Sequence, residues 1–308
     1  MKLTKRKELD FIHNFLSSVC TALKGTTEYK NEVLKARGFL VDTTPDGGFV
    51  FDERSNSSFE SDIYMKYLSA QDDELEKLFL KNSAYSSDGA DGYRALDNWK
   101  HCFASCNHRL GDTICTLHAD PFIARYVKAL STIGIHTAMS CDGWHDKQIN
   151  DRGPGRGMFT NNPVWIVFHD RFSLIWLRIL HDFDERLPST AALGFNVVQH
   201  NTSGLSEYVS RDTYRGCGYV QPDKTLFISC VEPNERLDKY IMLNRAAQAI
   251  YKNREYFYSV KWKTIELLKG ERKDGLPADR VFRMMVEAYL RTDTYNAQLR
   301  DFSPLPIK

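Results

Sequence analysis

Between residues 119 and 231, helix-like segments alternate with short apolar segments, and this alternation limits the possible folds more than any other feature. The apolar segments have the length and composition of strands, and they cover residues 135–139, 164–170, 195–200 and 225–231. Strands interleaved with helices favour a sheet on which helices pack. We therefore expect an α+β fold, with a mixed α/β core sheet, packed helices and a helical C-terminal region.

Two helices are expected within this core. Asp120 and Pro121 are suited to the N-cap and first position of a helix that ends at Gly134. Residues 171–183 form a strongly amphipathic pattern. Its expected buried side consists of Phe172, Ile175, Trp176, Ile179, Leu180 and Phe183.

The N-terminal segment has its own pattern. Residues 7–25 have apolar side chains at helical spacing, with Gly25 as the expected stop. Residues 38–53 read as a hairpin around Pro45–Gly48, and a helix carrying Ile63, Tyr64, Tyr67 and Leu68 follows. The small, polar stretch at 82–92 predicts a boundary. We expect an N-terminal α+β region at 1–90 and the central core at 93–232.

The remaining residues, 233–308, are expected to be mostly helical. A long helical run begins at Pro233 and breaks near 273–280, and a final helix carries Val281, Phe282, Met285 and Leu290. The aromatic side chains of this region exceed what one helix face needs to cover the core. They are Tyr251, Tyr256, Phe257, Tyr258 and Trp262. We expect most to cover the protein's own core and some to face another domain or subunit.

Composition excludes several classes of protein. The net charge of +1 does not indicate a strongly basic nucleic-acid binder, and no direct nucleic-acid binding is expected. No apolar run reaches the ~18 residues of a membrane span, and the N-terminus lacks the apolar segment of a signal peptide.

The seven cysteines are irregularly spaced and odd in number, which indicates reduced thiols in a cytoplasm. The low net charge also does little to oppose self-association, so we expect a homo-oligomer.

The sequence SCDGWH, at residues 140–145, brings together several residue types that can serve in catalysis or bind a metal. Cys141 and Asp142 follow an expected strand, and strand ends in α/β sheets commonly face ligand crevices. With His145 nearby, Cys141 is a candidate nucleophile, and Cys141, Asp142 and His145 are candidate catalytic residues or ligands. No oxyanion-hole motif accompanies them, and buried cysteines are usually inert. We therefore favour a structural role for them.

A second group raises the question of a metal. Cys102, Cys106, Cys115 and His118 could supply four zinc ligands. Their spacing is looser than the C-x2-C pairs of structural zinc sites, and two cysteines at i and i+4 also fit a packed helix face. We expect neither a metal nor a cofactor.

The segment from about 142 to 163 is long for a connection in a compact domain, which favours binding. Gly153, Gly155 and Gly157 lie beside Arg152 and Arg156. Glycine-rich backbone beside arginine can cradle phosphate. Neither the G-x-x-x-x-G-K-[ST] nor the G-x-G-x-x-G pattern is present, and a strand rather than a helix follows, so we favour a flexible surface loop. Residue types that anchor protein interfaces occur here, and the interface candidates are Trp144, Arg152, Arg156 and Phe159.

The block ADPFIARYVKALSTIGIHTAMSCDGWH, at residues 119–145, resembles a short block of uncharacterised phage and prophage proteins. In those proteins an Asp-Pro helix leads into a Gly-Ile-x-Thr strand that ends in Ser-Cys-Cys-Gly-His-Gly. This chain has Asp142 in place of the second cysteine, and Trp144-His145 in place of His-Gly. The departure argues against a metal or redox role here.

In size, and in lacking a recognisable catalytic signature, the chain as a whole resembles the Gabija anti-defence proteins of phages. The resemblance implies a phage protein that assembles around a host nuclease–helicase complex and prevents its action on DNA. We therefore expect a non-enzymatic interaction protein in the host cytoplasm. The alternative is a small nucleotide- or RNA-acting enzyme, or a metal-binding protein, centred on Cys141, Asp142 and His145.

Overall fold

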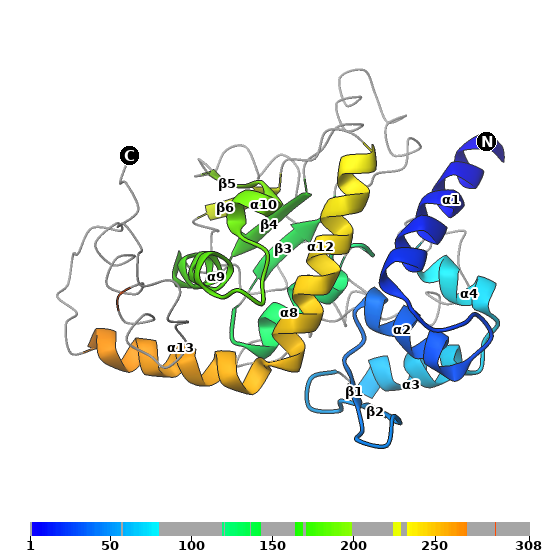
Figure 1. The fold of residues 1–308 in the computed structure, drawn as a ribbon, viewed down its shortest axis with the longest axis horizontal. Helices are drawn as coiled ribbons and strands as arrows, with labels where there is room; N and C mark the ends of the chain where they lie inside the picture. Colours follow the sequence, from blue (N-terminus) through cyan, green and yellow to red (C-terminus); the bar gives the residue numbers. More distant parts are fainter. Residues whose placement is uncertain are drawn as a thin grey trace, which may run out of the picture.

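The computed structural model describes residues 2–56, 58–79, 119, 121–135, 137–142, 164–168, 171–198, 224–228, 233–269 and 287. Helices predominate, and the strands of these ranges form two antiparallel sheets (Figure 1). The α+β class expected from the sequence is consistent with this mixture. No helix in these ranges is long and apolar enough to cross a membrane.

The N-terminal part begins with helices α1 (Lys2–Val19) and α2 (Thr27–Arg37). The expected helix stop at Gly25 was wrong, because α1 ends at Val19. The carboxylate of Glu32 accepts hydrogen bonds from the backbone N–H groups of Thr21 and Ala22, at 2.6 and 2.9 Å. These bonds hold the chain in a loop directly after α1. Thr26 then caps α2 by accepting the N–H of Tyr29.

The expected hairpin is confirmed. Strands β1 (Val41–Thr43) and β2 (Phe49–Phe51) pair antiparallel. The turn between them closes through a hydrogen bond from the Thr44 N–H to the Gly48 carbonyl. Helices α3 (Ser58–Leu68) and α4 (Asp72–Glu76) and the short 3-10 helix η1 (Lys77–Phe79) follow, and α3 confirms the helix expected there.

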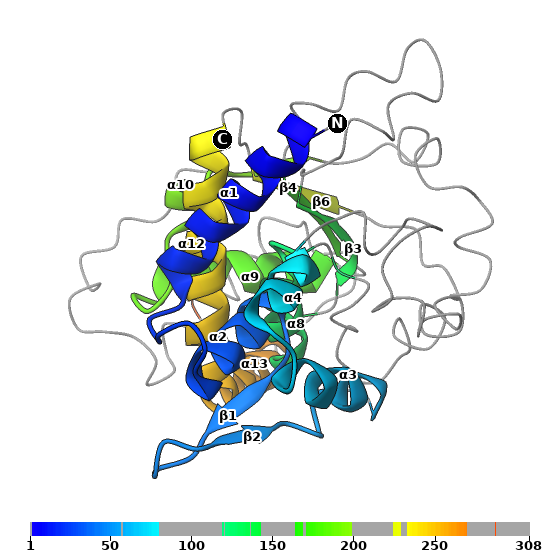
Figure 2. The same ribbon diagram turned by 90° about the vertical axis from the view of Figure 1, so that its right-hand side faces the viewer.

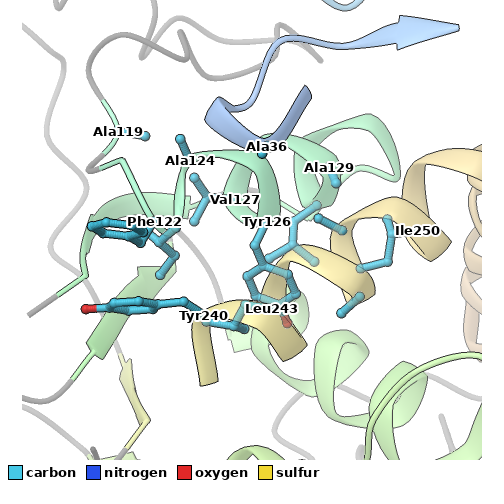
Figure 3. Packing of buried hydrophobic residues seen from close by; sticks show 14 of the residues in the cluster. Ala36, Ala119, Phe122, Ala124, Tyr126, Val127, Ala129, Tyr240, Leu243 and Ile250 are labelled. Atoms are coloured by element: carbon cyan, nitrogen blue, oxygen red, sulfur yellow. The ribbon is translucent and has the colours of Figure 1, made fainter. Parts of the chain in front are cut away.

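Helix α8 (Ala124–Thr132) lies at the centre of the molecule. Seven of its nine residues are buried, and it packs along α12 (Pro233–Lys252) and near the end of α2 (Figure 3). Turn residues precede it at 121–123, so the helix begins three residues later than the Asp-Pro pattern predicted. Gly134 follows it with a φ of 72°, in the left-handed region that suits a helix C-terminus.

Gly38, at the end of α2, allows the backbone to approach α8 closely. Its φ of 113° belongs to the region that favours glycine. A side-chain carbon there would lie 3.1 Å from backbone and side-chain atoms of Ala124. Both conditions require glycine, so the contact between α2 and α8 depends on this residue.

The four expected core strands are confirmed as a second sheet. They are β3 (Thr137–Cys141), β4 (Val164–Phe168), β5 (Phe195–Val198) and β6 (Lys224–Ile228), in the spatial order β3-β4-β6-β5. Every pair described is antiparallel, whereas the interleaved helices had favoured a mixed sheet. Because β4 and β5 both run antiparallel to β6, they are parallel to each other with β6 between them, as in a split β-α-β unit.

Helix α9 (Arg171–Phe183) matches the expected amphipathic segment, and the short α10 (Thr190–Leu193) follows it. Four of the six side chains expected on its buried side are confirmed as buried: Trp176, Ile179, Leu180 and Phe183. Together, α8, α9 and α12 lie on one side of the four-stranded sheet (Figure 2). That side holds much of a core that continues into the N-terminal helices.

The C-terminal helical run breaks earlier than predicted. Helix α12 ends at Lys252, and α13 (Arg254–Lys269) continues in a new direction (Figure 1). At the break, the Asn253 side chain donates a 2.7 Å hydrogen bond to the Ala249 carbonyl. The final helix expected at 281–290 lies outside the described residues except for Glu287, which is helical.

One ion pair is enclosed in the core. The ammonium group of Lys128, on α8, contacts the carboxylate of Glu60, on α3, and these side chains are 0% and 1% exposed. Removing one partner takes away the opposite charge that a buried charged group faces. Lys128→Met alone should therefore lower the free energy of unfolding by about 3–5 kcal/mol.

The double variant Lys128→Met, Glu60→Met should regain most of that loss, because well-packed apolar side chains often replace a buried ion pair at little cost. Urea denaturation of the parent, the single variant and the double variant measures both effects. A single variant as stable as the parent would contradict the prediction.

Candidate functional site

Of the three candidate residues Cys141, Asp142 and His145, the structure describes the side chain of Asp142, which is fully buried. Its carboxylate accepts a long hydrogen bond, 3.5 Å, from the N–H of Phe122. Phe122 lies in the turn before α8, where the positive end of the helix favours an acidic group. The N-cap residue of α8, Ile123, makes no side-chain capping hydrogen bond. Asp142 supplies a polar partner there from the end of β3.

The backbone of Asp142 is held as well. Its carbonyl accepts a short hydrogen bond from the hydroxyl of Tyr240, on α12. The ring of Tyr240 stacks on that of Phe122, with centroids 4.8 Å apart and planes 7° apart. Figure 3 shows these two rings facing each other beside α8. Phe11, on α1, meets both rings edge-on, so four segments join at this point.

These contacts indicate a structural role for Asp142 in the SCDGWH segment. A carboxylate that is fully buried and directed at a backbone N–H supports the fold at the end of β3. Cys141 lies in β3 with Trp165 as its partner in register, and its side chain is outside the described part of the chain. His145 also lies outside it, so a catalytic or ligand role for Cys141, Asp142 and His145 together stays an untested alternative.

The other expected site residues also lie outside the described residues. These are the possible zinc ligands Cys102, Cys106, Cys115 and His118, and the interface candidates Trp144, Arg152, Arg156 and Phe159. Within the described ranges, no group of three or more His, Cys, Asp or Glu side chains could hold a metal ion.

A buried histidine that the sequence analysis did not single out lies between α9 and α8. His181 Nε2 is 2.7 Å from the hydroxyl of Tyr126, and its Nδ1 is 2.6 Å from the carbonyl of Pro188. A carbonyl can only accept, so Nδ1 carries the proton and Nε2 accepts from Tyr126. Burial lowers the pKa of His181 from its usual 6.5 to about 4. The imidazole is therefore neutral, and it joins the two helices.

Cys20 is likewise held in an unreactive form. It is a free thiol, 9% exposed, at the end of α1. Burial raises the pKa of Cys20 to about 12, and the nearby Glu32 carboxylate acts in the same direction. A thiol with this pKa stays protonated at neutral pH and is a poor nucleophile.

The aromatic series of the C-terminal region divides between the core and the surface. Phe257 is fully buried, the Tyr251 hydroxyl donates to Asp52 at 2.9 Å, and Tyr256 lies under the guanidinium of Arg186. Tyr258 and Trp262 are each 44% exposed, and their rings meet edge-to-face with centroids 5.9 Å apart. This pair is therefore exposed, and the expectation that some of these rings face another domain or subunit stays a prediction.

Comparison of the chain with family models, with curated proteins and with solved structures finds no match. Inference about function therefore depends on the residues and their contacts.

The role of Asp142 predicts a stability effect. Asp142→Ala removes the acceptor for the Phe122 N–H and leaves that buried donor without its partner, which should cost about 1–3 kcal/mol of unfolding free energy. Tyr240→Phe retains the stacked ring and loses the hydroxyl, so it should cost about 1 kcal/mol. Urea denaturation measures both. Stability unchanged in Asp142→Ala would show that the carboxylate does not support the fold.

His181 predicts a pH effect. The folded protein binds the proton with a pKa of about 4 and the unfolded chain with the usual 6.5. The unfolded chain therefore gains protons first, and stability that is complete above pH 6.5 is lost as the pH falls towards 4. The expected loss is on the order of 3 kcal/mol.

Denaturation of the parent and of His181→Gln between pH 4 and 7.5 isolates this contribution, because glutamine does not titrate. The stability difference between the two proteins should shrink as the pH falls. A difference that is constant over this range would contradict the assignment.

Proposed function

We propose that the protein is a non-enzymatic interaction module, encoded by a phage, that binds a host anti-phage defence complex in the cytoplasm and blocks its action on DNA. The observation that carries the proposal is the exposed pair Tyr258 and Trp262 on α13. Aromatic side chains of these two types are enriched at protein interfaces, where they contribute much of the binding energy.

The contacts of the buried polar groups agree with this proposal. Asp142 and His181 are residue types that serve in catalysis, and both hold helices and strands together in this structure. Their burial leaves little room for a substrate to reach them.

The nature of the partner comes from the resemblance to Gabija anti-defence proteins. It implies a nuclease–helicase complex as the target and inhibition by assembly around it. The test is to mix the purified protein with a purified Gabija-type complex, to measure the mass of the product by light scattering and to measure DNA cleavage. A joint assembly with reduced cleavage supports the proposal, and an unchanged complex that still cleaves DNA refutes it. The mass of the protein alone tests the expected homo-oligomer.

Variants of the SCDGWH segment and of residues 152 and 156 distinguish an interaction module from an enzyme. Cys141→Ala removes little volume, so we expect inhibition to persist, with a stability cost on the order of 1 kcal/mol. Trp144→Ala, or Arg152→Ala with Arg156→Ala, should weaken partner binding by about 2 kcal/mol or more where these anchors are central.

Cleavage inhibition and thermal melting of the three variants, measured side by side, decide between the functions. A Cys141→Ala protein that melts like the parent yet no longer inhibits, beside loop variants that remain active, would make the segment a chemical site.

A further inference from the structure

One face of helix α13 is exposed and carries both aromatic and polar side chains. Glu255, Tyr258, Ser259 and Trp262 are all exposed, and their spacing of three, four and seven residues places them on one face of the helix. We call these four residues the α13 aromatic face. Phe257 and Val260, on the opposite side, are buried at 0% and 3% exposure. The helix is thus fixed by one side and open on the other.

The charge of this face selects a class of ligand. The faces of aromatic rings carry negative potential, and Glu255 adds a carboxylate one turn before Tyr258. Two rings and an acid on one face are complementary to a cation with a flat apolar surface. Guanidinium fits this description better than ammonium, because it is planar, stacks on rings and binds carboxylates through two parallel hydrogen bonds.

The protein uses the same combination within its own fold, next to this face. The Arg186 guanidinium lies 4.5 Å from the Tyr256 ring centroid and 4.7 Å from that of Phe257. It donates two hydrogen bonds, at 2.8 and 2.6 Å, to the carboxylate of Asp184. Rings at the start of α13 therefore already bind an arginine that a carboxylate orients.

A second instance lies at the junction of α12 and α13. Arg254 lies 4.2 Å from the centroid of the Tyr251 ring and donates a 2.9 Å hydrogen bond to Asp42, on β1. In both instances arginine stacks on a ring and an aspartate neutralises it. The α13 aromatic face has the rings and the carboxylate of this arrangement on its exposed side.

We propose that the α13 aromatic face is a docking site for an arginine side chain presented by a partner protein. The inference rests on the proposed function, which supplies a protein partner, and it names the chemistry that the partner must carry. Trp262 and Tyr258 would contact the guanidinium plane, and Glu255 would accept its N–H groups.

A probe tests the chemistry without the partner. The full-length protein is labelled with 5-fluorotryptophan, and the resonance that disappears in Trp262→Phe identifies residue 262. Titration with a capped arginine-rich peptide should shift this resonance. The same peptide with citrulline in place of arginine retains the shape and loses the charge, so it should leave the resonance unmoved. Equal shifts with both peptides, or no shift with either, would overturn the proposal.

The second arm uses the purified Gabija-type complex. Trp262→Ala should weaken its binding by about tenfold or more, as expected of a central anchor, and Glu255→Gln should weaken it by a smaller factor. Leu23→Ala and Glu74→Gln change exposed residues outside α13 and serve as controls that should bind like the parent. Thermal melting of each variant verifies that the fold persists.

The outcomes separate this inference from the proposed function. If the parent protein does not bind the complex, the proposed function fails, while the peptide titration still tests the face. If the parent binds and the α13 variants bind equally well, the inference alone fails. If Trp262→Ala instead converts a parent dimer into a monomer, the occupant is a second copy of the chain, and the arginine proposal is wrong.

Discussion

The enclosure of α8 is the constraint on which the rest of the structure depends. A helix surrounded by other elements can bury apolar side chains freely, but each polar group on it requires a partner. Lys128 meets Glu60 from α3, and Arg125 donates a 2.6 Å hydrogen bond to Asn244 on α12. Asn244 in turn donates to the Ala36 carbonyl at the end of α2. The N-terminal helices therefore complete the core, because they cover α8 and because Glu60 on α3 neutralises the charge of Lys128.

Periodicity predicted the elements well because it reflects burial within one segment. Helix α9, the hairpin and the four core strands all follow from their own apolar patterns. The break at Asn253 did not follow, nor did the end of α1, which depends on hydrogen bonds that compete with continued helix. Glu32, which binds the backbone after α1, lies on α2, and the residues near the end of α1 do not predict that contact. The prediction of a mixed sheet was wrong because alternation of strands with helices does not specify the direction in which neighbouring strands run.

The candidate site shows a similar division. Sequence proximity placed Cys141, Asp142 and His145 together, yet the contacts that explain Asp142 come from Phe122, 20 residues before it, and Tyr240, 98 residues after it. The surplus of aromatics was visible in the sequence. Which rings would be exposed was not, because Tyr251 and Tyr256 are covered through Asp52 and Arg186, residues far away in the chain.

The exposed rings of α13 are suited to binding because the helix that carries them is held firmly in place. Lys261 donates a short hydrogen bond to the carbonyl of Gly134, at the end of α8, and Phe257 is fully buried. The helix that carries Tyr258 and Trp262 is thus fixed to the central helix before any partner arrives. Binding to a rigid element loses less conformational entropy than binding to a loop, so more of the contact energy is available for affinity. The same enclosure of α8 that organises the core therefore also prepares the surface through which we propose the protein acts.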